Sequence, residues 1–461
     1  MGAGVSTKAF KEFDAALKDT EVTGKLAVRD CDLFALPPEV LERATHLTEL
    51  RLEHAKLKHL PASFGSLILL ERLSLAGNEL ETLPLSFHEL QRLEELDLSC
   101  NALSSLLGNF CNLGSLRRLC MYENALKKLP REFGALKSLE VLDMHNNALK
   151  RLPKSFPCLT SLTRLELSRN KLRKLPQAFG NLSALLICNL GRNMLRELPD
   201  YFGMLGALEV LSLSYNALYK LPASFAELTG LKNLSLTGNR IECFPALISP
   251  LTALVTLTYA ENRLRLWRPG EKSILDEEAP ESVYKLGTSD EEDTNEVGIT
   301  PSNPLVTLAA IQYLDLSDNA LEYLPSRGWG RLETLLHLKL SRNRLHLIPP
   351  EVGSLPRLQR LDIAANKLKT LPSSLFSNKS LAYLDAQQNT LQELPDNAGE
   401  CEALVRLVLT KNRDLRGLPR SICRLALLEE LRVDKSCFLA LGEELTAFAR
   451  AGLLLSRITI A

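Results

Sequence analysis

Residues 139–153 read LEVLDMHNNALKRLP, and close copies of this stretch recur through most of the chain. Leucines stand at 139 and 142, Met144 takes the next apolar slot, and Asn147 follows. Leu149, Leu152 and Pro153 complete the unit. The same residue classes return 23 residues earlier, around Asn124, and 23 residues later, around Asn170. A fixed period of this length indicates that one supersecondary unit is repeated along the chain.

The repeated unit has the form L-x-x-L-x-L-x-x-N-x-L, which resembles the leucine-rich repeat signature. The asparagine slot is filled at 78, 101, 124, 147, 170, 193, 216, 239 and 262, and again at 319, 343, 366, 389 and 412. Imperfect copies carry Cys31, Ala55 and Ser436 in that slot, which makes 17 repeats in all. The sequence therefore predicts an α/β solenoid, a leucine-rich-repeat horseshoe with a parallel concave β-sheet and a cap at each end.

The chemistry of one repeat explains these residue choices. The x-L-x-L segment alternates with period 2, so we expect a short strand with leucines on the buried face. One repeat cannot bury its leucines alone, but stacked neighbours can. Asparagine carries both a donor and an acceptor, so at the buried bend it can satisfy backbone groups of adjacent turns.

The amino-acid composition narrows the classes of function that the protein could have. The chain has 461 residues, with 55 Lys plus Arg and 55 Asp plus Glu, and this balance argues against a nucleic-acid partner. We expect no transmembrane helix and no signal peptide, because there is no run of 18 apolar residues and no apolar core near the N-terminus. The ten cysteines form no C-x-x-C pair, so buried free thiols in an intracellular protein are the expectation.

The first 22 residues carry a second signal. Residues 1–6, MGAGVS, match the N-myristoylation pattern, which makes Gly2 the candidate lipidation site. A helix is expected from Ser6 to about Asp19, with Phe10, Phe13 and Leu17 as one apolar stripe. We expect this helix to cap the first repeat, with a membrane-lying helix as the alternative. One myristoyl chain alone predicts weak, reversible membrane association.

The unit L-P-x-x-F-G-x-L-x-x-L-x-x-L-x-L-x-x-N-x-L, as in residues 60–80, is similar to the 23-residue class of cytoplasmic leucine-rich repeats. Ras-group-related and Ras-suppressor-like proteins belong to that class. The resemblance implies a protein-binding scaffold whose partner is a small GTPase, a phosphatase or a kinase complex. It implies no partner-specific residues, because the class shares only its scaffold leucines.

The spacing of the repeats also divides the chain into segments. Regular repeats occupy 23–267, and the 57-residue step from Asn262 to Asn319 contains an acidic insertion over 268–304. Residues 271–300 hold ten acidic side chains and two lysines, which predicts disorder. Ser289 precedes Asp-Glu-Glu and is the candidate phosphorylation site, and a surface loop without a function is the alternative. Repeats resume over 305–436, and 437–461 is expected to cap the last repeat, with a helix over 441–451.

No catalytic, metal or cofactor pattern stands out, so we expect a non-enzymatic protein with no cofactor. Function is then expected on the outward positions of the concave strands, where Tyr and Arg are common hot-spot residues. The candidate partner-binding residues are Arg118, Tyr122, Glu123, Asp143, His145, Glu166, Arg169, Arg192 and Tyr215.

Two functions from different classes remain open at this point. The first is a monomeric signalling adaptor in the cytoplasm, peripheral on a membrane through Gly2, that binds a protein on its concave face. The second is a structural or assembly component of cytoskeletal or other large complexes. Stoichiometric capture of a soluble signalling protein favours the first, and detergent-resistant pelleting with filaments favours the second.

Overall fold

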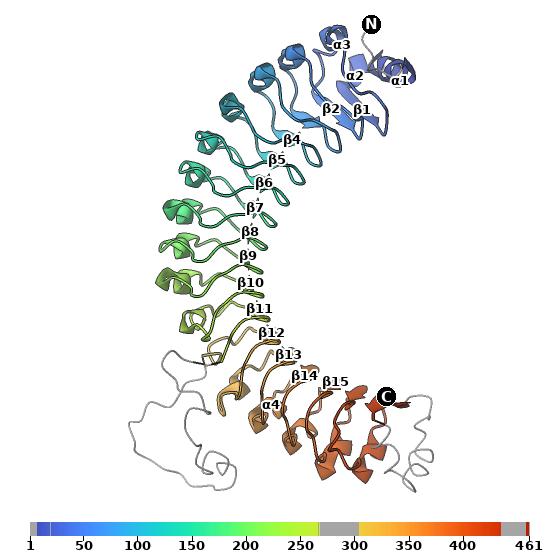
Figure 1. Ribbon diagram of the computed structural model, residues 1–461, viewed down its shortest axis with the longest axis vertical. Coiled ribbons are helices and arrows are strands. Elements are labelled where there is room, and N and C mark those ends of the chain that lie inside the picture. The colour runs from blue at the N-terminus through green and yellow to red at the C-terminus, as the bar shows by residue number, and fades with distance from the viewer. Residues whose placement is uncertain (1–6, 19, 266, 268–303, 435–457, 461) are drawn as a thin grey trace. The chain divides into compact units, whose positions relative to one another are not determined.

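The computed structural model describes residues 7–18, 20–265, 267, 304–434 and 458–460. The chain forms two compact units, Met1–Leu228 and Thr229–Ala461. Each unit is a stack of repeats with parallel strands on one side and short helices on the other (Figure 1). The predicted α/β leucine-rich-repeat solenoid is thereby confirmed.

The N-terminal elements close the first repeat of the first unit. They are α1 (Thr7–Lys18), α2 (Thr20–Thr23), β1 (Lys25–Arg29), α3 (Pro38–Arg43) and β2 (Glu49–Glu53). Phe13 and Leu17 of α1 are each only 2% exposed, as a helix that covers the end of a core requires. The Arg43 guanidinium binds Asp14 and holds the pKa of that carboxyl below its usual value. This ion pair ties α1 to α3.

The remaining strands of the first unit are short and pair in parallel, each with its sequence neighbour. They are β3 (Arg72–Ser74), β4 (Glu95–Asp97), β5 (Arg118–Cys120), β6 (Val141–Asp143), β7 (Arg164–Glu166), β8 (Ile187–Asn189) and β9 (Val210–Ser212). The register aligns the same slot of every repeat, so Leu119, Leu142 and Leu165 lie side by side. All three are fully buried. The same register aligns the outward-facing residues of successive repeats.

Eight 3₁₀ helices form the outer side of this unit. They are η1 (Ala62–Ser66), η2 (Leu85–Glu89), η3 (Gly108–Asn112), η4 (Phe133–Ala135), η5 (Phe156–Cys158), η6 (Gln177–Asn181), η7 (Phe202–Met204) and η8 (Ala223–Glu227). Each buries one phenylalanine. The rings stack from Phe64 to Phe110 and again from Phe133 to Phe225. Their centroids lie 6.1 Å apart for Phe133 and Phe156 and 5.9 Å apart for Phe179 and Phe202. The sequence period of this phenylalanine predicts the same aromatic spine.

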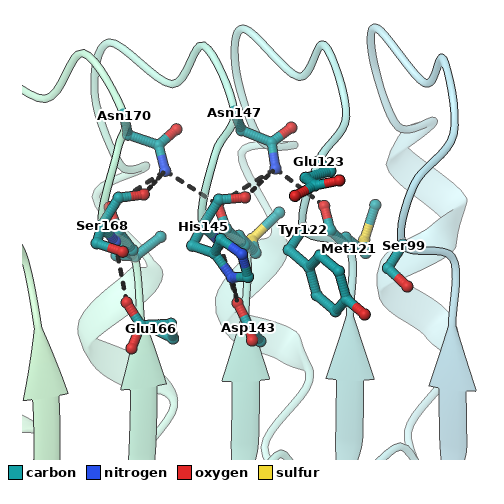
Figure 2. A network of polar contacts seen from close by, with 12 residues as sticks. Ser99, Met121, Tyr122, Glu123, Asp143, His145, Asn147, Glu166, Ser168 and Asn170 are labelled. Carbon is teal, nitrogen blue, oxygen red and sulfur yellow. Dashed lines mark hydrogen bonds and ion pairs between the residues drawn. The ribbon is translucent and has the colours of Figure 1, made fainter.

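The asparagine ladder behaves as the sequence predicts. The Asn147 amide nitrogen donates to the carbonyls of Met121 at 2.9 Å and Met144 at 3.2 Å. Its oxygen accepts the Leu126 N–H at 3.0 Å. One buried side chain therefore joins its own repeat to the preceding one, and Asn170 repeats the arrangement one step further (Figure 2).

The second unit continues the pattern with more variation. Its strands are β10 (Asn233–Ser235), β11 (Thr256–Thr258), β12 (Tyr313–Asp315), β13 (His337–Lys339), β14 (Arg360–Asp362), β15 (Tyr383–Asp385), β16 (Arg406–Val408), β17 (Glu430–Val433) and β18 (Ile458–Ile460), all parallel. Its outer helices are η9 (Ala246–Ile248), η12 (Trp329–Arg331), α4 (Pro350–Gly353), η13 (Ser373–Leu375), η14 (Asp396–Glu400) and η15 (Arg420–Arg424).

The outer core of this second unit is no longer a phenylalanine stack. Val352, Leu375, Ala398 and Ile422 fill the slot and are fully buried, as the sequence indicates. Trp329 is also fully buried there, and the sequence reading missed it because its repeat is one residue longer. Its indole N–H donates to the Pro325 carbonyl at 2.8 Å, which satisfies the ring's only polar atom.

Strands β11 and β12 pair directly, with Thr256 opposite Tyr313, so the repeats close up across the acidic insertion. Gly2, Ser289, nearly all of the insertion over 268–304 and the helix expected over 441–451 lie outside the described residues. Of the expected C-terminal cap, three residues are described, and they form β18, which extends the sheet beyond β17.

Candidate protein-binding face

Charges on the first strands of the outward face neutralise one another. Glu49 lies 3.5 Å from the Lys25 ammonium and 3.8 Å from the Arg72 guanidinium. Arg72 in turn lies 3.8 Å from Glu95 on the next strand. Because each charge already has a neighbour of opposite sign, this ladder offers little unpaired charge to a partner.

An aromatic and polar cluster follows at the carboxyl ends of β5 and β6 (Figure 2). The Tyr122 and His145 rings stack with centroids 4.7 Å apart and an angle of 10° between their planes. His145 Nδ1 lies 2.7 Å from Asp143 Oδ1, so the carboxylate fixes the orientation of the imidazole. All three side chains are partly exposed. The cluster is rigid before any partner arrives, which limits the ordering entropy lost on binding.

Burial and neighbouring charges keep the Tyr122 phenol protonated. The Ser99 hydroxyl acts to lower the pKa of this phenol, but burial and the Asp97 carboxylate outweigh it and raise the pKa above its usual value. At neutral pH Tyr122 is therefore a hydrogen-bond donor with an accessible aromatic face.

The structure places the nine candidate residues in three different positions of the repeat. Arg118, Asp143 and Glu166 lie within strands, and Tyr122 and His145 follow two residues after β5 and β6. The sequence reading also assigned Glu123, Arg169, Arg192 and Tyr215 to the strand face. These four instead occupy the turn just before the ladder asparagine, with left-handed φ values of 53° or 54°.

The turn position is a consequence of the bend that the asparagine stabilises. The turn follows the strand, so these four residues lie at the edge of the sheet, beyond the strand ends. At this edge the Arg192 guanidinium lies 4.5 Å from the centre of the Tyr215 ring, in cation–π contact. The structure therefore forms two clusters from the nine residues, Tyr122 with His145 and Asp143 on the face, and Arg192 with Tyr215 on the edge.

A second polar cluster lies on the strand face of the second unit. The Tyr383 ring on β15 has the Arg360 guanidinium 4.4 Å from its centre and that of Arg406 at 5.3 Å. Asp362 and Asp385 stand opposite each other on β14 and β15. The candidate residues chosen from the sequence do not include this Arg–Tyr–Arg stack, although its three side chains share one repeat slot.

Solved structures confirm what the repeats indicate. A leucine-rich repeat protein of Leptospira interrogans is 30% identical, with 92% of this chain and 97% of the other aligned and a TM-score of 0.74. Family models for a leucine-rich repeat region match residues 95–190, and for leucine rich repeats 198–241 and 333–391. The chain belongs to the leucine-rich repeat family.

Two further leucine-rich repeat structures are complexes. The Arabidopsis receptor kinase HAESA, with the peptide hormone IDA and the co-receptor SERK1, is 25% identical over 87% of this chain and 72% of its own, with a TM-score of 0.53. The Drosophila Toll–Spatzle complex is 24% identical over 89% of this chain and 53% of its own, with a TM-score of 0.69, and shows the fold alone. No curated protein sequence matches the chain.

The described ranges contain no group of three His, Cys, Asp or Glu side chains that could hold a metal ion. Burial raises the pKa of the Cys111 thiol to about 11 and that of Cys120 to about 12, so these thiols are unreactive at neutral pH. In the described part of the chain, no helix is long and apolar enough to cross a membrane.

Proposed function

We propose that the chain is a non-enzymatic scaffold in intracellular signal transduction that binds a protein partner on the strand face of its first unit. The observation that carries this proposal is the ordered Tyr122–His145–Asp143 cluster beside the self-paired charge ladder. Binding of protein ligands is what the leucine-rich repeat family typically does. The partner classes favoured by the sequence resemblance are a small GTPase, a phosphatase or a kinase complex.

The physical case rests on what the cluster offers. Two stacked rings present a flat, rigid surface, and a carboxylate and a phenol supply directional hydrogen bonds beside it. Hot spots at protein interfaces combine these properties, because aromatic area is buried at a low loss of side-chain entropy. The Arg192–Tyr215 pair adds a second anchor at the edge of the same unit.

The test is affinity capture from source-type cells with C-terminally tagged full-length protein. We expect a stoichiometric signalling partner whose binding weakens about 30-fold in the Tyr122→Ala/His145→Ala variant, since a hot-spot pair contributes about 2 kcal/mol or more. Arg72→Ala, on the self-paired ladder, is the matched control and should bind like wild type. Equal capture by all three proteins would place the site elsewhere.

The location of the scaffold belongs to the same proposal. A Gly2→Ala variant tests whether the N-terminal pattern is used, with the mass of the N-terminal peptide as the direct measurement of myristoylation. We expect wild type to divide between cytoplasm and membrane, and Gly2→Ala to stay in the cytoplasm. Detergent-resistant pelleting with filaments would instead support the structural or assembly role.

A further inference from the structure

A strip of positive charge follows one edge of the first unit in three consecutive repeats. In each of these repeats, two cations occupy the segment that joins the ladder asparagine to the outer helix. We define the basic edge as Lys127, Lys128, Lys150, Arg151, Arg173 and Lys174. All six side chains are exposed. In the described structure none of the six forms an ion pair with a carboxylate, unlike the charge ladder on the strands.

Backbone hydrogen bonds hold these segments in register. The Ala148 N–H donates to the Leu126 carbonyl at 3.0 Å, and the Lys171 N–H donates to the Leu149 carbonyl at 2.9 Å. The same slot in successive repeats therefore lies side by side, which places Lys127 beside Lys150 and Arg151 beside Lys174. The six cations form two parallel rows of like charge.

These rows do not help the fold. Neighbouring like charges repel, and they raise the free energy of the folded state. The two repeats directly before this strip fold without them, because the equivalent slots hold Glu81 and Thr82, then Ser104 and Ser105. After the strip, Glu197 follows Arg196 and ends the run of like charge. The concentration of charge in three repeats of a chain with zero net charge points to an anionic partner.

We propose that the basic edge docks on the anionic surface of a lipid bilayer. Each pair of cations is flanked by leucines, so the strip offers no aromatic platform on which nucleotide bases could stack. Beyond it, Tyr219 occupies the slot of Arg173 two repeats later and is 50% exposed, and Met194 is 47% exposed. Tyrosine and apolar side chains beside cations suit the lipid–water interface.

The basic edge also supplies a second membrane-binding signal beside the N-terminal myristoylation pattern. One myristoyl chain binds membranes only marginally, and stable anchoring requires a second signal such as a polybasic surface. The proposal does not depend on Gly2 being modified, because an unmodified protein should already bind acidic vesicles through the six cations. Each cation near an anionic surface contributes about fivefold to binding.

The experiment is co-sedimentation of full-length, unmodified protein with vesicles of phosphatidylcholine alone or with phosphatidylserine added. Wild type should bind only the phosphatidylserine vesicles and should dissociate as salt is raised. Lys150→Glu/Arg151→Glu should weaken binding at least tenfold. The matched control is Lys367→Glu/Lys369→Glu, which makes the same charge change at exposed sites of the second unit and should bind like wild type.

Three results would overturn the proposal. They are equal binding to both vesicle types, equal binding by the edge variant and wild type, and binding to a homopolymeric RNA without binding to vesicles. Thermal unfolding of the edge variant tests whether it is still folded. The carboxylate that replaces Arg151 would lie between Lys128 and Lys174, so the melting midpoint should not fall. Partner capture by the same variants separates this proposal from the protein-binding one, since the edge variant retains Tyr122 and His145.

Discussion

Each ladder asparagine satisfies backbone groups in two repeats at once. Asn147 is 8% exposed, and its amide reaches carbonyls of its own repeat and of the repeat before it. An apolar side chain of similar size would leave the Leu126 N–H without a partner. It would also remove one of the two amide donors that each of those carbonyls has, since the neighbouring ladder asparagines supply the other. Unsatisfied buried polar groups are more costly than the hydrogen bonds themselves are favourable.

Asn147→Leu should therefore lower the free energy of unfolding by about 2–4 kcal/mol. Urea unfolding followed by circular dichroism measures this loss. The neighbouring Asn146→Gly is the control, because Asn146 is exposed and has a φ of 54°, which glycine adopts freely. An unchanged midpoint for Asn147→Leu would contradict the role assigned to the ladder.

Glycine after the spine phenylalanine permits close contact between outer helices. A Cβ on Gly203 would lie 1.8 Å from the Ser224 carbonyl oxygen, whereas a Cβ on Gly206 would meet nothing within 4 Å. Gly203→Ala should therefore destabilise the protein by about 1–3 kcal/mol, because backbone must move to relieve the overlap. Gly206→Ala, in the same repeat, should leave the thermal midpoint nearly unchanged. Equal midpoints for the two variants would argue against this packing.

Among the elements, the strands position the side chains of the proposed binding face, and the outer helices carry packing. A strand of three residues presents only two outward side chains, so a useful surface has to be assembled from neighbouring repeats. Tyr122 and His145 are 23 residues apart in sequence and meet only because β5 and β6 pair in register. The phenylalanine spine holds that register from the other side of the repeat.

On the β14–β15 pair, the carboxyl of Asp385 should make the stability of the protein depend on pH. Burial raises the pKa of Asp385, and the Asp362 carboxylate adds to the increase, whereas the Gln387 N–H acts against it. Because the folded state holds this proton more tightly than the unfolded chain, stability falls as pH rises from the unfolded-state pKa through the raised folded-state value. Above the folded-state pKa of Asp385, no further stability is lost from this group.

Asp385→Asn should therefore raise the thermal midpoint at neutral pH and flatten its dependence on pH in the acidic range. The amide oxygen can still accept the Gln387 N–H, now 3.0 Å from Oδ1, so the backbone keeps its partner. Thermal unfolding from pH 3 to pH 8 measures the effect. A midpoint that falls at neutral pH would mean that the Asp385 charge is stabilised by its neighbours.

At the scale of the molecule, each repeat packs mainly against the repeats next to it, so a long insertion between two repeats can leave their pairing intact. Strands β11 and β12 pair although 57 residues separate Thr256 from Tyr313. Ser249 donates to the Pro304 carbonyl at 2.8 Å, which fixes the chain where the described residues resume. The intervening segment therefore does not interrupt the sheet of the second unit.

Deleting residues 271–300 should shift the thermal midpoint by no more than about 2 °C, since shortening a loop changes its closure entropy only slightly. Differential scanning calorimetry of the deletion protein beside wild type provides the measurement. A Ser289→Ala protein with the loop intact is the control for effects of phosphorylation. A large drop in the midpoint would show that the segment packs on the repeats.

Local pattern was sufficient for the fold because most repeats share the same 23-residue spacing. The period predicts which leucines are buried, where each asparagine lies and that phenylalanines stack, since each depends on residues at a constant separation. The sequence reading could not place Glu123, Arg169, Arg192 and Tyr215 correctly, because the position of the bend depends on backbone torsion. It also missed Trp329, whose repeat departs from the period by one residue.

The sequence by itself determined the architecture of this protein, a solenoid of leucine-rich repeats, because burying one leucine-rich face per turn requires stacked turns. Only the tertiary structure decided which surface residues act together. The Tyr122–His145 stack, the Arg360–Tyr383–Arg406 sandwich and the rows of the basic edge each join side chains from different repeats. Such contacts depend on lateral register and side-chain direction, which no single repeat encodes.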